Sequence, residues 1–212
     1  MSMDVCVNIN GIELKTERLL IRPWNYSDLN DFFEYASVCG VGEMAGWNHH
    51  KSIDESRKIL EIFINEHKTF ALEFKDNKKV IGSVGIEKIN PLYDPYENMY
   101  GKEIGYVLSK DYWGRGLMTE AVKRVIDYCF DDLRLDYLWI SHWIKNDRSR
   151  RVIEKCEFEF IKEFEYTCQN GDVRPSKGYQ KLNVRRHDKK LVVRKSENSG
   201  FLCYDKSNRE TE

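Results

Sequence analysis

The chain has 212 residues, of which 41% are hydrophobic and 33% are charged, and its formal net charge is −1. These values are typical of a soluble globular protein that is long enough for one domain with a tail. The near-neutral charge argues against nucleic acid as the main partner, and no apolar run approaches the roughly 18 residues that a membrane helix needs.

Neither a secretory signal nor a disulfide framework is visible in the sequence. Residues 1–6 lack the basic region and the apolar segment of a signal peptide. The six cysteines are scattered and contain no Cys-x-x-Cys pair, which favours reduced thiols. We therefore expect a cytoplasmic protein.

The first half of the chain alternates between strand and helix patterns. Its expected elements are a strand at 17–24, a helix at 27–38, a helix that follows residue 52, and a hairpin of strands at 69–74 and 79–88. The second of these helices begins at a capping box, in which the side chains of Ser52 and Glu55 each accept a backbone N–H.

The second half contains the longest predicted helix. Its expected elements are a polar loop at 90–101, a strand at 102–109, a helix from 117, a strand at 137–143, a short helix from 147, a strand at 158–166 and a final edge strand at 176–182. The long helix places its apolar side chains on one broad face: Leu117, Met118, Ala121, Val122, Val125, Ile126, Cys129 and Phe130. The mixed order of elements predicts an α/β (α+β) fold, in which helices cover a sheet.

The junction before the long helix reads Tyr-Trp-Gly-Arg-Gly at residues 112–116. Gly114 and Gly116 lack side chains, so an anion can approach the backbone N–H groups at the helix start, where the helix dipole adds partial positive charge. The sequence lacks the Gly-Lys-Ser/Thr ending of a magnesium-binding P-loop, and Thr119 stands where a dinucleotide fingerprint has its third glycine or alanine. The junction therefore favours a pyrophosphate bound without metal, as in coenzyme A.

Four segments together resemble the GNAT N-acetyltransferases. The acyl-CoA-binding pattern of that family, Gln/Arg-x-x-Gly-x-Gly/Ala, is matched at Gly116, with Trp113 in the first position and Met118 in the last. The tryptophan within Tyr-Trp-Gly-x-Gly is similar to the RimJ/RimL-type branch. Three more segments resemble, in the expected order, the first strand, the third strand and the site-closing helix of that branch: 16–23, 79–86 and 146–155.

The resemblance, which covers residues 14–165, implies both a fold and an activity. The implied fold is a GNAT domain over residues 1–182, with a mixed, mostly antiparallel sheet of about six to seven strands and about four flanking helices. The implied activity is transfer of an acetyl group from acetyl-CoA to a primary amine, by direct attack in a ternary complex. An alternative is a non-catalytic acyl-CoA sensor or interaction module with the same fold.

The resemblance also implies which residues bind acetyl-CoA. They lie on one strand, at the glycine junction and at the starts of the next two helices: Tyr106, Val107, Leu108, Trp113, Gly114, Arg115, Gly116, Leu117, Met118, Thr119, Asn146 and Ser149. Acetyl-CoA is the implied cosubstrate, and no metal is implied.

Glu103 is the implied catalytic base, because the RimJ/RimL-like pattern carries a carboxylate on this strand. An α-amino group has a pKa of about 8 and a lysine one of about 10.4, so an amine acceptor needs a group that takes its proton. Strand alternation puts Glu103 and Gly105 on one face and Tyr106 on the other. The alternative for Glu103 is an ordinary exposed strand carboxylate.

Ser149 is the implied proton donor to the leaving thiolate. Many GNATs carry a tyrosine four residues after this serine, whereas this chain has Ile153. Asn146 and Ser149 lie one helical turn apart and face the same way, and the alternative for both is a helix cap. Cys129 and Cys156 lie on or just past apolar helix faces, so we interpret them as core residues and not as covalent nucleophiles.

The acceptor pocket is implied to include Trp47, His49 and His50, because their segment can line that pocket in this family. The two histidines have no Cys, Asp or His at ligand spacing in the sequence, so no metal site is expected there. The expected partners are acetyl-CoA and an amine acceptor, either a small molecule or a protein N-terminus, with neither nucleic acid nor membrane.

The C-terminal extension at 183–212 is basic, and the family resemblance does not account for it. One interpretation is a solvated, partly disordered extension. The other is a pair of strands used in substrate binding or in a homodimer. Glu157 is a further departure, because the family prefers glycine there, which ends the preceding helix in the left-handed conformation.

Overall fold

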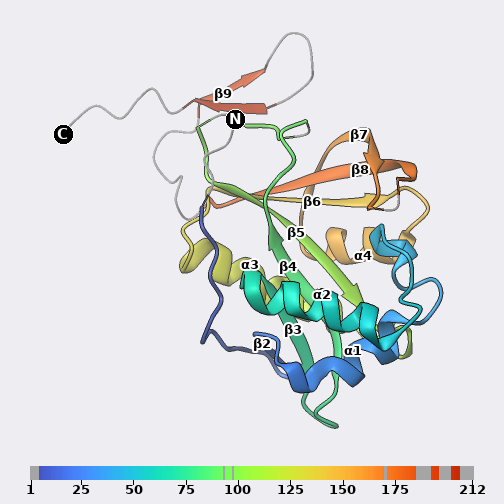
Figure 1. The fold of residues 1–212 in the computed structure, drawn as a ribbon. Helices are drawn as coiled ribbons and strands as arrows, with labels where there is room; N and C mark the ends of the chain where they lie inside the picture. The colour runs from blue at the N-terminus through green and yellow to red at the C-terminus, as the bar shows by residue number, and fades with distance from the viewer. Residues whose placement is uncertain are drawn as a thin grey trace.

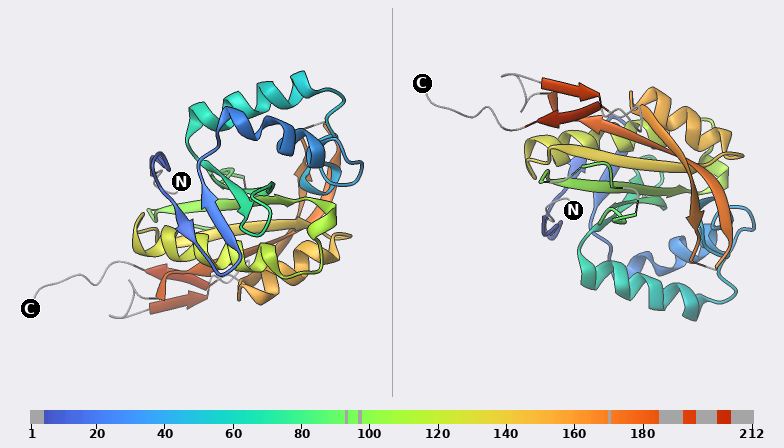
Figure 2. Two further views of the ribbon diagram at one scale, coloured as in Figure 1. Left: turned by 90° about the horizontal axis from the view of Figure 1, so that it is seen from below. Right: turned by 90° about the horizontal axis from the view of Figure 1, so that it is seen from above.

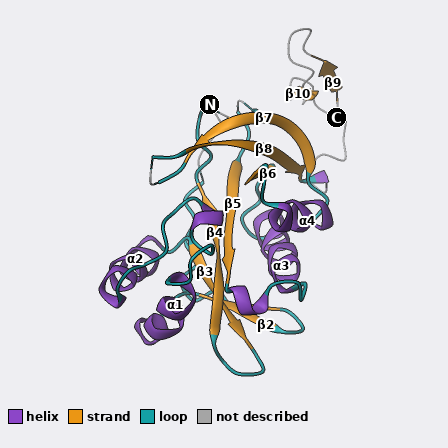
Figure 3. Cartoon of the chain, turned by 90° about the vertical axis from the view of Figure 1, so that its right-hand side faces the viewer, coloured by secondary structure: helices purple, strands orange, loops and turns teal. Residues whose placement is uncertain are grey.

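An eight-stranded sheet with helices on both faces forms the body of the structure (Figure 1). This computed structural model describes residues 5–92, 94–96, 98–169, 171–184, 192–195 and 202–205. Helices α1 (Leu29–Ala36) and α2 (Ile53–Glu66) cover one face, and α3 (Leu117–Asp131) and α4 (Asp147–Lys155) cover the other (Figure 2 and Figure 3). Short 3-10 turns lie at Tyr26–Asp28 (η1), Glu43–Ala45 (η2) and Lys110–Tyr112 (η3). The predicted α/β class is confirmed.

The sheet is mixed and mostly antiparallel, as predicted. Its strands in chain order are β1 (Leu14–Lys15), β2 (Leu19–Arg22), β3 (Thr69–Phe74), β4 (Val80–Glu87), β5 (Gly101–Leu108), β6 (Tyr137–Trp143), β7 (Glu159–Thr167) and β8 (Val173–Leu182). Their order across the sheet is β1-β2-β3-β4-β5-β6-β8-β7. Neighbouring strands are antiparallel except β5 and β6, which run parallel.

The strand count differs from the predicted six to seven, since the sheet has eight strands. β1 contains only two residues, too few for an alternating pattern to reveal it, and it pairs with β2. The predicted edge strand at 176–182 is instead the ten-residue β8, which pairs with β6 on one side and β7 on the other. β7 therefore forms the edge of the sheet.

Helix α3 packs its apolar face on the sheet. Its eight predicted apolar positions all have exposed fractions of 7% or less. They share one core cluster with sheet residues such as Ile86, Ile104 and Leu138. Burying one large apolar side chain stabilises a fold by about 1.5–3 kcal/mol, so this face holds α3 in a defined place on the sheet. Among the described residues, no helix is long and apolar enough to cross a membrane.

A second core lies between the sheet and helices α1 and α2. Its largest buried members are Trp24, Phe32, Tyr35 and Leu60. Ser52 caps α2 as predicted, because its hydroxyl accepts the Glu55 N–H at 3.3 Å. The reciprocal half of the capping box differs, since the Glu55 carboxylate accepts the N–H of Lys51 at 2.8 Å instead of that of Ser52.

The C-terminal extension contains a strand pair. β9 (Val192–Lys195) and β10 (Leu202–Asp205) pair antiparallel in a separate two-stranded sheet. The other residues from 185 onward lie outside the described residues. The interpretation of a partly disordered extension concerns these residues. The domain boundary after residue 182, and a role of the extension in substrate binding or a homodimer, stay predictions.

Glu157 ends α4 in the left-handed conformation, as the family's preference for glycine at this position predicts. Its φ is +60°. The Glu157 N–H donates to the Glu154 carbonyl at 3.0 Å, and the Phe158 N–H donates to the Ile153 carbonyl at 3.3 Å, which are the two bonds of a Schellman motif. A non-glycine residue in this conformation costs about 1–2 kcal/mol, so the corner is strained.

We expect Glu157→Gly to stabilise the protein by up to about 1 kcal/mol, because glycine adopts a positive φ without the Cβ penalty although it loses more chain entropy. The exposed pair that Glu157 makes with Lys181, 3.4 Å apart, contributes little. Glu159→Gly is the matched control, since Glu159 lies in the extended backbone of β7, where glycine weakens a strand. Denaturant unfolding should give opposite signs for the two variants; a destabilised Glu157→Gly protein would contradict the strain.

Candidate active site

The parallel strands β5 and β6 separate after a short stretch of pairing. Their register contains three residue pairs, ending at Glu103 and Trp139. Beyond them β5 continues to residue 108 and β6 to residue 143, and the two strands diverge (Figure 1). We call the space between residues 103–108 and 139–143 the wedge. At its closed end, a Cβ on Gly101 would lie 2.1 Å from the Tyr137 ring, so glycine is required for this close approach.

Glu103 lies where the wedge opens. Its side chain is half-buried, and the Ser141 hydroxyl of β6 donates to its Oε1 at 3.3 Å. Burial raises the pKa of Glu103 to about 7, the negative charge of Glu87 adds to the rise, and the bond from Ser141 opposes it. Glu87 stands directly across on β4, where its carboxylate pairs with Lys68 at 2.8 Å. A carboxylate with this pKa differs from the ordinary exposed strand carboxylate of the alternative interpretation.

Tyr106 and Ser149 form a hydroxyl pair at the other face of β5. The two side-chain oxygens are 2.8 Å apart, and the Tyr106 hydroxyl also lies 3.3 Å from the Ser149 carbonyl oxygen. Burial raises the pKa of Tyr106 although the bond to Ser149 opposes the rise, so the phenol keeps its proton near neutral pH. No sequence pattern reveals this pair, because strand β5 and helix α4 meet only in the fold. Ile153 is fully buried in the core.

Asn146 is the N-cap of α4, as its alternative interpretation proposed. Its Oδ1 accepts the backbone N–H of Ser149 at 3.1 Å. Its Nδ2 donates to the carbonyl oxygen of Met44 at 3.3 Å. The start of α4, at the backbone of Ser149, and the turn η2 are therefore joined by one side chain.

The glycine junction adopts the conformation that its residues allow. Gly114 has φ +76° and Gly116 has φ +78°, both in the left-handed region. Gly116 is the N-cap of α3, and its carbonyl accepts the Glu120 N–H at 3.1 Å. A Cβ on Gly114 would meet nothing within 4 Å, so the backbone there is open to a ligand. The first N–H groups of α3 are available to an anion at this point.

Hydrogen bonds brace the junction from two sides. The Arg18 Nη1 donates to the Arg115 carbonyl at 2.9 Å, and the same guanidinium pairs with Glu120 of α3 at 2.6 Å. Partial burial alone would raise the pKa of Glu120, but the bonds from Thr16 and Arg18 outweigh it and lower this pKa. The Trp113 indole N–H donates to the Leu108 carbonyl at 2.9 Å. The backbone of the junction is thus held in place by the protein itself.

Arg148 is a candidate site residue that no sequence pattern reveals. It lies in the first turn of α4, and its guanidinium carbon is 4.3 Å from the Trp113 ring centroid. A positive charge therefore lies beside the glycine junction. The guanidinium of Arg115 packs instead over Tyr112, with its carbon 5.3 Å from that ring centroid. Nothing in the local pattern distinguishes Arg148 from the neighbouring arginines of α4.

The remaining residues predicted to bind acetyl-CoA differ in how their side chains are placed. The side chains of Leu108, Leu117 and Met118 are buried in the core, so these residues can offer a ligand only their backbone groups. Val107 is half-buried and packs against the core under α1 and α2. The Thr119 carbonyl lies 3.9 Å from the Cys156 sulfur of α4.

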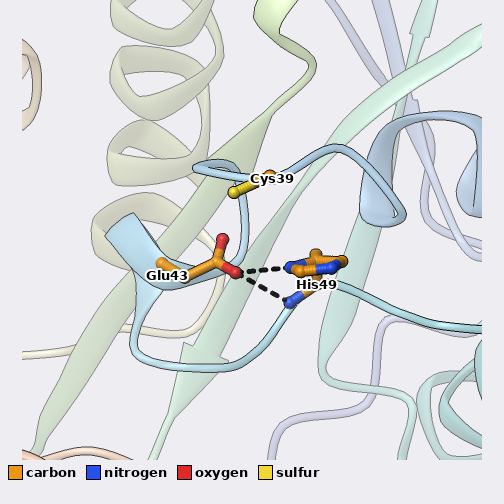
Figure 4. A group of neighbouring side chains, drawn as sticks. All are labelled: Cys39, Glu43 and His49. Atoms are coloured by element: carbon orange, nitrogen blue, oxygen red, sulfur yellow. Dashed lines mark hydrogen bonds and ion pairs between the residues drawn. The ribbon is translucent and has the colours of Figure 1, made fainter.

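Glu43 organises the segment of residues 39–49, which we call the Glu43 loop (Figure 4). Its carboxylate accepts the Gly40 N–H at 2.7 Å, the His49 N–H at 3.2 Å, and lies 2.7 Å from the His49 Nδ1. Partial burial alone would raise the pKa of Glu43, but these bonds outweigh it and lower the pKa to about 2. The loop is therefore closed around a carboxylate that stays ionised.

The three predicted acceptor residues have different environments. His50 is buried, its Nδ1 lies 2.7 Å from the Ser56 hydroxyl, and burial lowers its pKa. This ring packs on Phe32 in the core, and an acceptor contact of His50 stays a prediction. Trp47 is half-buried against His50, and His49 is half-buried beside Glu43. An acceptor contact of Trp47 or His49 likewise stays a prediction.

The cysteines of the two site helices are core residues, as interpreted from the sequence. Cys129 and Cys156 are buried, and burial raises the pKa of both, that of Cys156 to about 11. Neutral buried thiols are poor nucleophiles. The sequence offers His49 no Cys, Asp or His at ligand spacing, but the fold brings Cys39 and Glu43 beside it (Figure 4).

Comparisons with known proteins agree with this geometry. Residues 18–159 match the sequence profile of the family described as Acetyltransferase (GNAT) domain. The "Probable N-acetyltransferase YjcK" of Bacillus subtilis (strain 168) is 30% identical over 156 residues, which cover 68% of this chain and 82% of that protein.

Solved structures share the fold. A GNAT-family acetyltransferase from Bacillus anthracis is 22% identical with a TM-score of 0.71, and the match covers 82% of this chain and 99% of that one. The Microcin C7 self immunity acetyltransferase MccE, solved in complex with acetyl-CoA and AMP, is 16% identical with a TM-score of 0.66, and the match covers 79% of this chain and 93% of that one.

Proposed function

The chain belongs to the GNAT acetyltransferase family and is an N-acetyltransferase with acetyl-CoA as cosubstrate, and we propose that it acetylates a primary amine by direct attack in a ternary complex. The acceptor is a small molecule or a protein N-terminus, and the motif at residues 112–116 supports the RimJ/RimL-like branch. One observation carries the proposal: Glu103 and the Tyr106–Ser149 hydroxyl pair lie on opposite faces of β5, beside the same wedge.

The glycine junction is the proposed site for the pyrophosphate of acetyl-CoA. The open backbone at Gly114, the N-terminus of α3 and the guanidinium of Arg148 all favour an anion there. The diverging edge of β5 from Tyr106 to Leu108 is the proposed path for the rest of the molecule. This path brings the thioester to the Tyr106–Ser149 pair and to the Glu103 end of the wedge.

The proposed chemistry needs one proton acceptor and one proton donor. Glu103 takes a proton from the ammonium form of the acceptor, so that the neutral amine can attack the thioester carbonyl. As the carbon–sulfur bond breaks, Ser149 donates a proton to the thiolate and Tyr106 supplies one to Ser149. The coenzyme leaves as a thiol. Glu103 passes the ammonium proton to solvent, then takes the second proton that the amine nitrogen loses after the attack, and this second proton returns through solvent to Tyr106.

The Tyr106–Ser149 hydroxyl pair argues against the alternative function, a non-catalytic acyl-CoA sensor. Ile153 supplies no acid, and this absence and the Glu157 substitution are the features that favour the sensor. Tyr106 brings a phenol to the same serine from β5 instead. We therefore favour turnover, and release of free thiol from acetyl-CoA with a panel of amines and peptides separates the two functions.

Gly116→Val tests the proposed pyrophosphate site. A β-branched residue is strained at φ +78° and would distort the junction, so acetyl-CoA affinity should fall at least tenfold, about 1.4 kcal/mol. Gly11→Val is the matched control, because Gly11 has φ +73° and lies outside the site. Calorimetry on both folded variants decides: equal affinities would refute this binding mode.

Glu103→Gln tests the base through pH dependence. Protonated Glu103 cannot accept a proton, so kcat/KM should fall as pH drops through about 7, the pKa of this group. The variant should lose that limb and a factor of about 10²–10⁴ in rate at neutral pH. Glu87→Gln is the control: removing the opposing charge should move the limb to lower pH and keep the rate. A wild-type profile for Glu103→Gln would remove Glu103 from the mechanism.

Ser149→Ala and Tyr106→Phe test the proton donor. Each should lower kcat and kcat/KM together while acetyl-CoA affinity is kept, because the interaction is made as charge develops on sulfur. The Asn146 cap survives in Ser149→Ala, since it uses the backbone N–H. Ser52→Ala, which removes the cap of α2, should cost about 1 kcal/mol of stability and leave the rate unchanged. If the Ser149 and Tyr106 variants behave like this control, the pair has no catalytic part.

A further inference from the structure

The Glu43 loop brings three different metal-binding side chains together at the surface. Cys39, Glu43 and His49 each offer one ligand atom, and these atoms all lie within 4.8 Å of one another (Figure 4). The sulfur belongs to an exposed residue, and the carboxylate and imidazole are half-buried. We propose that Cys39, Glu43 and His49 form a site for Zn²⁺.

The ligand set matches the chemistry of zinc. Thiolate, imidazole and carboxylate are its usual protein ligands, and three protein ligands leave a fourth position for water. Soft thiolate together with imidazole favours zinc over magnesium or calcium, which prefer sets of oxygen ligands. The Glu43 carboxylate accepts the Gly40 N–H at 2.7 Å and the His49 N–H at 3.2 Å, so its position within the loop is fixed by the backbone.

The spacing of the ligand atoms requires only a small adjustment. Bonds of about 2.0–2.3 Å at tetrahedral angles place two ligands about 3.4–3.7 Å apart. The Glu43 carboxylate and the His49 Nδ1, at 2.7 Å, are already closer than this because a hydrogen bond joins them. Cys39 lies on the exposed part of the loop, where a rotation of its side chain can bring the sulfur nearer. The ion would replace the hydrogen bond between Glu43 and His49.

The position of the loop gives the site a consequence for the rest of the protein. The Met44 carbonyl accepts from the Asn146 amide, and the Glu43 carbonyl accepts from Arg174 of β8, whose guanidinium carbon lies 5.0 Å from the Trp143 ring centroid. A bound ion would thus fix a loop that is tied to the N-terminus of α4 and to the open end of the wedge. The zinc site itself does not depend on the proposed acetyl transfer.

Cobalt titration of the full-length, reduced protein tests the site, since Co²⁺ replaces Zn²⁺ and reports thiolate ligation by a charge-transfer band. We expect one ion per chain, the band in the wild type, and its loss when Zn²⁺ is added. Cys39→Ser should abolish the band, and His49→Gln should weaken cobalt binding at least about tenfold. Cys6→Ser is the matched control, because Cys6 is also exposed and lies outside the proposed site, and it should keep the band.

Thermal unfolding gives a second measurement, because an ion that binds only the folded state raises the Tm. Added Zn²⁺ should raise the Tm of the wild type and of Cys6→Ser, but not that of Cys39→Ser. The proposal is overturned if the wild type shows no thiolate band, or if Cys39→Ser keeps the band. A band lost in Cys6→Ser instead would assign the metal to the N-terminal segment and refute this site.

Discussion

The short parallel pairing of β5 with β6 is the constraint on which the site depends. It ends after three residue pairs, and the close packing at Gly101 and Tyr137 holds the strands together at the closed end only. Each diverging strand then leads into a helix, so α3 begins after β5 and α4 begins after β6. Two helix N-termini therefore face one opening, and the 4.3 Å approach of Arg148 to Trp113 bridges them. A positive local potential for an anion follows from this arrangement alone.

The same opening explains how groups on opposite faces of a strand can serve one reaction. Glu103 and Tyr106 are three residues apart on β5, so an intact sheet would keep them on separate sides. The pairing of β5 with β6 ends at Glu103. A ligand between the diverging strands can therefore contact both Glu103 and Tyr106. Partial burial at the edge of this opening also raises the pKa of Glu103 to about 7, which suits a proton acceptor at neutral pH.

Local patterns predicted local structure well and non-local contacts poorly. The apolar face of α3, the span of β6 at 137–143, the cap at Ser52 and the corner at Glu157 follow from periodicity and from steric rules that act within a few residues. The position of β8 inside the sheet, the core role of His50 and the Tyr106–Ser149 pair depend on residues far apart in the chain. Periodicity contains no information on such pairings.

Asn146 caps α4 and also binds a second segment of the chain. Its oxygen accepts the Ser149 N–H, and its nitrogen donates to the Met44 carbonyl. Serine, threonine and aspartate also cap helices, but an ionised aspartate has no hydrogen to donate to the Met44 carbonyl. The amide thus couples the helix that holds Ser149 to the loop that holds Trp47 and His49. One side chain thus links Ser149, the proposed proton donor, to the loop proposed to contact the amine acceptor. A shift of either segment is therefore transmitted to the other.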